Sequence, residues 1–313
     1  MTVGIGIAGP GAGRAALAAL HMVERVGRGM LGGFVSLAAL DARGNLHRAE
    51  TGRGGAAALF AGAMPEEIAN APRVALISSG PDRLPPLSQF TPATAGLACI
   101  SGHRLPNMPA VPGGEAVNVL ALTAIAQGGA AQDVLDSLLA RYPQADAGLI
   151  AVTASGEVAM ANSALVAKRT DAGALMTCDA GLKIAILHNA IFPVKGLAEI
   201  AAGAAIDSCV PADAYDFEIS LTAGVPLNAS EQTGVEIDGD GRVIGINGLH
   251  KGWMEPIWQG AAAMRGSPVL RGGRQIGTLV SEAYCIAHHG VLRSCDGLAS
   301  VRLQVRATEA SSQ

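Results

Sequence analysis

Two short segments carry arginine, serine and proline in the same order, each after an apolar run. Ser78–Pro85 follows Val74–Ile77, and Ser101–Asn107 follows Leu97–Ile100. Each segment contains Ser-Gly and then, one or two residues later, Arg-Leu-Pro. Functional side chains concentrate in loops that a rigid scaffold holds. We therefore expect a site built from these two loops.

The side chains of the two loops suit a small substrate that carries an anionic group. Arg83 and Arg104 are expected to bind its carboxylate, because a guanidinium donates two parallel hydrogen bonds to a carboxylate. Ser79 and His103 are expected to supply acid–base groups, and Asn107 is expected to bind substrate. The alternative is a pair of structural turns in which the polar side chains cap backbone N–H groups.

A polar pair also ends an apolar segment further along the chain. His188 and Asn189 follow Ile184–Leu187. We expect both residues to bind substrate. The alternative for His188 is a buried histidine that one hydrogen bond satisfies.

A glycine-rich segment near the start matches part of a nucleotide-binding motif. Gly9–Gly13 lies between the apolar strand Val3–Ala8 and a helix predicted from Ala15 to about Val26. Such glycines let backbone N–H groups approach a pyrophosphate at a helix N-terminus. Asp41, however, lies further along than the roughly 20 residues that the motif requires. A turn that packs a helix on a strand is favoured, and a nucleotide-dependent enzyme is an alternative.

These segments must be positioned by strands and helices that the pattern of apolar residues predicts. Hairpins are expected at Phe34–Leu40 with Leu46–Thr51, at Leu149–Thr153 with Val158–Asn162, at Val235–Asp238 with Arg242–Ile246, and around His288–Gly290. Further strands are expected at Val74–Ser78 and Gly96–Ile100, and helices at Glu115–Ala126, Ala130–Arg141 and Val194–Ile206. From about Pro211 turns and β-branched residues dominate, so we expect one domain over 1–210 and a smaller, mostly β part over 211–313, ending in the polar tail Glu309–Gln313.

Composition excludes several classes of protein. Of the 313 residues, 50% are hydrophobic and 15% charged, which excludes a disordered chain. The net charge of −4 argues against nucleic-acid binding. No apolar run reaches the ~18 residues of a membrane span, and no secretory signal is visible.

The cysteine content and the low charge bear on where the protein is located and on whether it forms oligomers. Five scattered cysteines favour a reducing cytoplasm. Cys285, His288, His289 and Cys295 match no zinc pattern. We expect no metal and no cofactor, and the low charge suggests a homo-oligomer.

Two stretches resemble the N-terminal-nucleophile (Ntn) hydrolases. Phe34–Leu46, with Gly54-Gly55 beyond it, is similar to the opening hairpin of the isoaspartyl-peptidase kind. Gly129–Asn162, a helix followed by a hairpin, is similar to gamma-glutamyltranspeptidases and to uncharacterised bacterial Ntn-like proteins. The resemblance implies an α+β fold, an αββα four-layer sandwich with two antiparallel sheets packed face to face.

The same resemblance implies a Thr, Ser or Cys nucleophile whose own α-amine is the base. Phe34 occupies the position at which the hairpin of these hydrolases would place the nucleophile. Ser36 could serve only if the chain were cleaved after Val35. Thr2 is exposed by removal of Met1, and Thr2-Val3-Gly4 is similar to a family start. The resemblance therefore predicts an amidohydrolase that cleaves a C–N amide bond of a small polar or carboxylate-bearing metabolite, with Thr2 as nucleophile. A binding protein that keeps the sandwich without a nucleophile is the other alternative.

Overall fold

The computed structural model describes residues 1–60, 62–210 and 215–308. Contacts divide the chain into two compact units, Met1–Val210 and Pro211–Gln313, and each is described by itself. Both Pro211, where the sequence predicted a boundary, and the tail Glu309–Gln313 lie outside the described residues. Helices and antiparallel strands occur in different layers of the first unit, and the fold class is α+β.

Unit 1 contains a six-stranded sheet with the strand order β3-β2-β4-β1-β10-β9. Its strands are β1 (Thr2–Ala8), β2 (Val35–Leu40), β3 (Leu46–Thr51), β4 (Arg73–Ser79), β9 (Ala172–Asp179) and β10 (Leu182–Asn189). Every neighbouring pair in this sheet is antiparallel. The strand that begins at Thr2 therefore lies inside the sheet, between β4 and β10.

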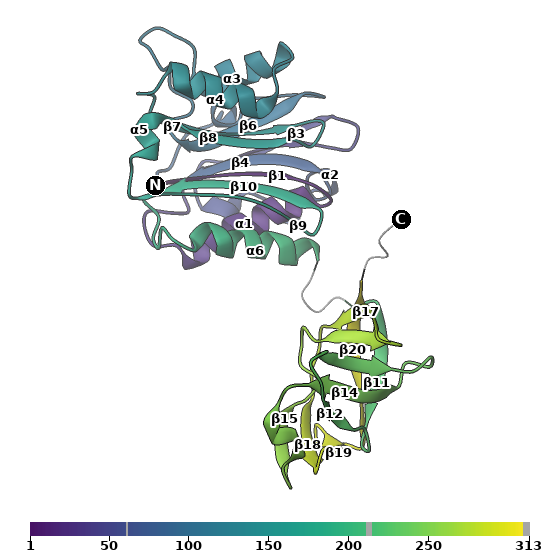
Figure 1. The fold of residues 1–313 in the computed structure, drawn as a ribbon. Helices are drawn as coiled ribbons and strands as arrows, with labels where there is room; N and C mark the ends of the chain where they lie inside the picture. The colour runs from purple at the N-terminus through teal and green to yellow at the C-terminus, as the bar shows by residue number, and fades with distance from the viewer. Residues whose placement is uncertain (61, 211–214, 309–313) are drawn as a thin grey trace. The chain divides into compact units, whose positions relative to one another are not determined.

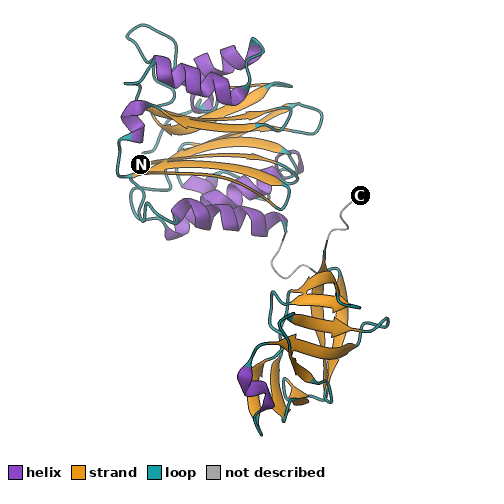
Figure 2. Cartoon of the chain, in the orientation of Figure 1, coloured by secondary structure: helices purple, strands orange, loops and turns teal. Residues whose placement is uncertain are grey.

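A second sheet of unit 1 has the order β5-β6-β7-β8. Its strands are β5 (Ala93–Thr94), β6 (Ala98–Arg104), β7 (Ala147–Thr153) and β8 (Val158–Asn162). The two sheets lie face to face, with helices on both outer sides (Figures 1 and 2). Helices α1 (Ala12–Val26) and α6 (Leu197–Cys209) cover the first sheet, and α3 (Val117–Ala126) and α4 (Ala131–Arg141) cover the second. The shorter elements are η1 (Gly55–Ala58), α2 (Glu66–Ala69), η2 (Ser88–Phe90) and α5 (Ala164–Ala167).

Alternation along β1 sorts its side chains between the two faces of the first sheet. Val3, Ile5 and Ile7 are buried in the core that α1 and α6 share with this sheet. Gly4 and Gly6 face the second sheet, where a Cβ on Gly4 would overlap the carbonyl oxygen of Gly102. The glycines thus let the two sheets approach closely, and the alternation places Thr2 on this inner face as well.

The structure corrects several predicted bounds. Strand β6 does not end at Ile100 but continues to Arg104, so Ser101–His103 is not a loop. Polar side chains occur inside this strand because they face the other sheet, where the Ser101 hydroxyl donates to the carbonyl oxygen of Leu76. Helix α1 begins at Ala12, before the predicted Ala15, and α6 occupies Leu197–Cys209.

Unit 2 consists of strands with one short 3₁₀ helix among its described residues. Its seven-stranded sheet has the order β11-β20-β17-β16-β13-β14-β12, and a smaller sheet has the order β15-β18-β19. The strands are β11 (Phe217–Thr222), β12 (Leu227–Ala229), β13 (Gly234–Ile237), β14 (Val243–Gly248), β15 (Trp258–Ala261), β16 (Pro268–Arg271), β17 (Arg274–Leu279), β18 (Tyr284–His288), β19 (Val291–Cys295) and β20 (Ser300–Ala307), and the 3₁₀ helix is η3 (Lys251–Met254). In neither unit does a described helix have the length and apolar character to cross a membrane.

Candidate functional site

Thr2 lies in a row of three polar side chains on the inner face of the first sheet. It pairs directly with Ser79 of β4 on one side and with Asn189 of β10 on the other. Side chains directly opposite each other in antiparallel strands share a face, with Cβ atoms about 4.5–5.5 Å apart. The three residues are 7%, 9% and 1% exposed, respectively. The sheet therefore holds two hydrogen-bonding groups beside the threonine hydroxyl.

A cavity of about 220 Å³ opens at this end of the two sheets. It is lined by Met1, Thr2, Phe34, Ile77, Ser79, Pro81, Arg83, Phe90, Arg104 and Leu105. The fold thus brings together four residues that the sequence predicted from separate segments, namely Thr2, Ser79, Arg83 and Arg104. One wall is aromatic, because the Phe34 and Phe90 rings lie 4.5 Å apart.

The peptide group before Thr2 is held by two hydrogen bonds. The Ser79 hydroxyl donates to the carbonyl oxygen of Met1 at 2.7 Å, and the Gly80 N–H donates to the same oxygen at 3.3 Å. The Ser79 hydroxyl is therefore hydrogen-bonded to the residue that precedes Thr2. Burial, followed by the charge of Arg104, lowers the pKa of the Met1 amine from its ordinary value. The surroundings therefore make the charged form of this amine less favourable than it is in water.

The two arginines of the cavity differ in their partners. Arg104 is paired with Asp146, to which its Nε donates at 2.8 Å and its second guanidinium nitrogen at 2.5 Å. The predicted carboxylate-binding role of Arg104 is thus corrected: two of its guanidinium nitrogens, Nε and one terminal nitrogen, already donate to the carboxylate of Asp146. Arg83 is exposed and has no ion pair with any described residue. It also lines an adjoining cavity of about 480 Å³ with Arg53, so it is available to an anionic ligand.

His103 and Asn107 lie outside this cavity, contrary to the prediction. His103 is fully buried in β6, and its Nε2 lies 2.8 Å from Oδ1 of Asn162. Burial lowers the pKa of His103 to about 4, although the hydrogen bond to Asn162 opposes the shift. Asn107 Nδ2 donates to Oε1 of Gln89. Neither side chain lines the space next to Thr2, so the catalytic role of His103 and the binding role of Asn107 are corrected.

His188 and Asn189 are neighbours in β10 and therefore face opposite sides of the sheet. His188 pairs with Val3 and Gly173, and a Cβ on Gly173 would overlap its ring. This face packs against the helices, and burial lowers the pKa of His188, although the charge of Glu199 in α6 opposes the shift. The predicted substrate role of His188 is therefore corrected, whereas Asn189 lies on the same face as Thr2.

The glycine-rich segment is a packing turn. β1 is antiparallel to both of its neighbours, whereas a dinucleotide-binding unit needs a parallel crossover. The Gly13 N–H donates to the carbonyl oxygen of Ala71, and a Cβ on Gly13 would overlap the carbonyl oxygen of Ile68. These contacts explain the glycine without a phosphate, and they argue against the nucleotide-dependent alternative.

The other candidate nucleophile of the resemblance, Ser36, lies within β2. Its hydroxyl is buried and forms a 2.6 Å hydrogen bond with the hydroxyl of Thr91. Cleavage before Ser36 would break the strand after its first residue, Val35. Thr2, which opens its strand, is therefore the better placed of the two.

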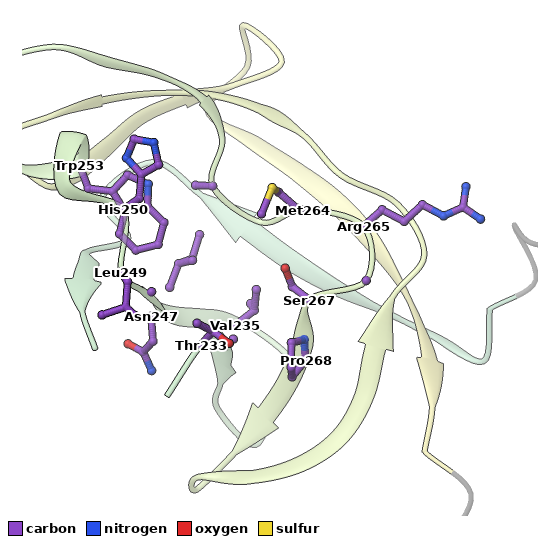
Figure 3. Close-up of a pocket in the computed structure, with 15 residues that line it drawn as sticks. Thr233, Val235, Asn247, Leu249, His250, Trp253, Met264, Arg265, Ser267 and Pro268 are labelled. Atoms are coloured by element: carbon purple, nitrogen blue, oxygen red, sulfur yellow. The ribbon is translucent and has the colours of Figure 1, made fainter. Parts of the chain in front are cut away.

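Unit 2 contains a second cavity, of about 520 Å³, that the sequence did not predict (Figure 3). Leu249, Trp253 and Met264 line it, together with the hydroxyl-bearing Thr233 and Ser267. Figure 3 shows Leu249 and Met264 on different walls. The signal available in the sequence was the closeness of the chain's two tryptophans, Trp253 and Trp258. Their rings pack with that of His250, and Trp253 and His250 line the cavity. Within the described ranges, no group of three or more His, Cys, Asp or Glu side chains is placed to hold a metal ion.

Comparison with known protein families gives one match for each unit. The family described as "Domain of unknown function (DUF6963)" matches residues 2–217. The chain belongs to this family. The DUF6963 match spans nearly all of unit 1, including the row formed by Thr2, Ser79 and Asn189. A second description, "Domain of unknown function (DUF7259)", matches residues 224–300, which contain the tryptophan cavity of unit 2. No curated protein matches the chain.

Proposed function

We propose that the DUF6963 unit is an Ntn-type amidohydrolase that cleaves the C–N amide bond of a small, carboxylate-bearing metabolite, with Thr2 as its nucleophile. The position of Thr2 carries the proposal. It is the first residue of an inner strand, it faces a second sheet, and it lines a cavity with Ser79 and Arg83. The order of helices, sheet, sheet and helices supports assigning unit 1 to the αββα four-layer sandwich of these hydrolases.

The chemistry begins after water hydrolyses the peptide bond between Met1 and Thr2, which releases Met1 as the free amino acid and leaves the α-amine of Thr2. This amine takes the proton of the Thr2 hydroxyl while Oγ1 attacks the carbonyl carbon of the substrate amide. A C–O bond forms, the C–N bond breaks, and the proton passes to the leaving nitrogen. Water then hydrolyses the ester and regenerates the hydroxyl. A neutral α-amine is required, and the pKa of the neighbouring Met1 amine is lowered by burial and by the charge of Arg104.

Two other residues have defined parts in this proposal. The Ser79 hydroxyl, which donates to the carbonyl oxygen of Met1 in the intact chain, loses that acceptor when Met1 leaves; it then hydrogen-bonds the free α-amine and orients it. Arg83, whose guanidinium has no ion pair among the described residues, binds the substrate carboxylate.

The nucleophile is tested first by intact mass and then by activity. The mass determines whether the chain begins at Thr2, and para-nitroanilides of glutamate, aspartate and alanine are then offered as substrates. Thr2→Ala is expected to abolish release of para-nitroaniline, whereas Thr2→Ser should retain part of it because it keeps a hydroxyl. Ser36→Ala, which removes a buried hydroxyl away from the cavity, is the matched control and should leave kcat unchanged. Full activity of Thr2→Ala would exclude the proposed mechanism.

The substrate class is tested by the same assay. Arg83→Gln should raise KM for the acidic amides by about 10- to 100-fold, the range expected for loss of a hydrogen bond to a charged group. The KM for the alanine amide should change little. Arg53→Gln, in the adjoining cavity, is the control for a general loss of positive charge. Equal effects on acidic and neutral amides would contradict the assignment of Arg83.

A further inference from the structure

Buried polar atoms without partners are concentrated around the candidate site. Among the described residues, six such side-chain atoms occur, and five of them belong to His103, His188 and Asn189. Both polar atoms of Asn189 are included, although its side chain is only 1% exposed. Leaving a buried amide unpaired costs stability, and native proteins keep few such groups. The amide of Asn189 therefore calls for an explanation other than folding.

The register places this amide next to the hydroxyl of Thr2. Asn189 is the direct partner of Thr2 across β1 and β10. Two residues earlier in β10, Leu187 packs against Ile150 and Val152 of the second sheet, so this face of β10 is the inner one. On the other side of Thr2, the Ser79 hydroxyl is directed to the Met1 carbonyl. Asn189 thus has an unused N–H donor in the strand position opposite Thr2, on the other side from Ser79, although it is not itself among the residues that line the cavity.

An unused donor at this position suits the charge that develops during acyl transfer. When Oγ1 attacks an amide, the carbonyl oxygen becomes negatively charged, and a fixed neutral donor stabilises it without transferring a proton. A carboxamide is such a donor and does not titrate. His103 is less suitable, because it lies in the opposite sheet and its Nε2 is hydrogen-bonded to Asn162.

We propose that Asn189 is a catalytic residue whose Nδ2 donates a hydrogen bond to the substrate carbonyl oxygen in the transition state. This inference rests on the proposed function, in which Thr2 is the nucleophile. It explains why a fully buried amide is kept without a partner: the ligand supplies the acceptor during the reaction.

The test uses para-nitrophenyl acetate, an activated ester that acylates nucleophiles without requiring the natural substrate. The rate of para-nitrophenolate release and the peptide that gains the acetyl group are measured on the full chain. Asn189→Leu and the smaller Asn189→Ala should each slow acylation at Thr2 by about 10²- to 10³-fold. Thr2→Ala supplies the background rate.

The thermal midpoint separates catalysis from a structural role. Asn189→Leu replaces two unpaired buried atoms with methyl groups, so the Tm of unit 1 should rise, by roughly 2–4 °C. A structural role would instead lower the Tm along with the rate. His188→Leu is the matched control: it removes two unpaired nitrogens from the opposite face of the same strand, so it should raise the Tm without slowing acylation.

The outcomes distinguish this inference from the function on which it rests. If wild-type Thr2 is acylated and both Asn189 variants react at the wild-type rate, the role of Asn189 is overturned and the nucleophile stands. If wild-type Thr2 is not acylated above the Thr2→Ala background, both proposals are overturned. If Asn189→Leu lowers the Tm and Asn189→Ala retains the acylation rate, the amide is structural.

Discussion

At the scale of single residues, the chemistry of unit 1 depends on which face of a strand each polar side chain occupies. Thr2, Ser79 and Asn189 share the inner face of one sheet, whereas His188, next to Asn189, faces the helices. His103 faces inward but from the opposite sheet, and it is fully buried. The inner row is the one that the proposed acyl transfer would use, and burial lowers the pKa of both histidines.

The burial of His103 predicts how stability depends on pH. An unfolded histidine binds a proton below its ordinary pKa of 6.5, whereas folded His103 does so only at about 4. Between these values the unfolded chain binds more protons, so the free energy of unfolding should fall as the pH decreases through this window. The shift corresponds to roughly 3 kcal/mol at most.

Urea unfolding above, within and below that pH window measures this dependence. His103→Gln, which does not titrate, should flatten the slope, and His188 contributes in the same direction because its pKa is also lowered. A wild-type stability that stays constant from neutral pH to pH 4 would contradict the neutral, buried state of His103.

At the scale of elements, the closeness of the two sheets depends on glycines in the strands. A Cβ on Gly4 of β1 would overlap backbone atoms of Gly102 in β6, and backbone cannot move aside as a flexible side chain can. The close approach of the two sheets also buries the row formed by Thr2, Ser79 and Asn189. The spacing of the sheets and the geometry of the site are therefore set by the same contacts.

Gly4→Ala should lower the free energy of unfolding of unit 1 by about 1–3 kcal/mol or more, because the added methyl group forces the sheets apart. Chemical denaturation followed by far-UV circular dichroism measures this. The matched control is Gly203→Ala in α6, where a Cβ would meet no atom within 4 Å. It should stabilise the helix by up to about 1 kcal/mol. Similar effects of the two substitutions would show that sheet spacing is not the constraint.

At the scale of the whole molecule, each unit has a hydrophobic core of its own. Leu37 belongs to the core between the first sheet and α1, and Leu303 belongs to the core of unit 2. Both tryptophans, Trp253 and Trp258, lie in unit 2. Tryptophan fluorescence therefore reports on one unit, and circular dichroism on both. The expected homo-oligomer stays a prediction.

Leu303→Ala should lower the stability seen by tryptophan fluorescence by about 2–5 kcal/mol, the usual cost of removing a buried leucine side chain. Leu37→Ala, an equally buried leucine of unit 1, should leave the fluorescence transition in place and move only the dichroism transition. If both substitutions shift the fluorescence transition equally, the two units unfold together.

The sequence by itself determined the local elements, because alternation of apolar residues and glycine turns act over a few neighbours. The strand at Thr2–Ala8 and the hairpins formed by β2 with β3 and by β7 with β8 follow from such local patterns. Ser79 and Arg83 were also singled out as candidates, from their positions after a strand, and Thr2 was singled out from the resemblance to the Ntn hydrolases.

Only the tertiary structure decided which candidates meet and what each one faces. The polar residues of β6 have the sequence pattern of a loop, although they belong to a strand. They are buried against a strand that is distant in the sequence. Arg104 is occupied by Asp146, and Asn189 comes to lie beside Thr2, through pairings between residues far apart in the chain. Strand order and register are collective properties of the packed sheets, so no local pattern contains them.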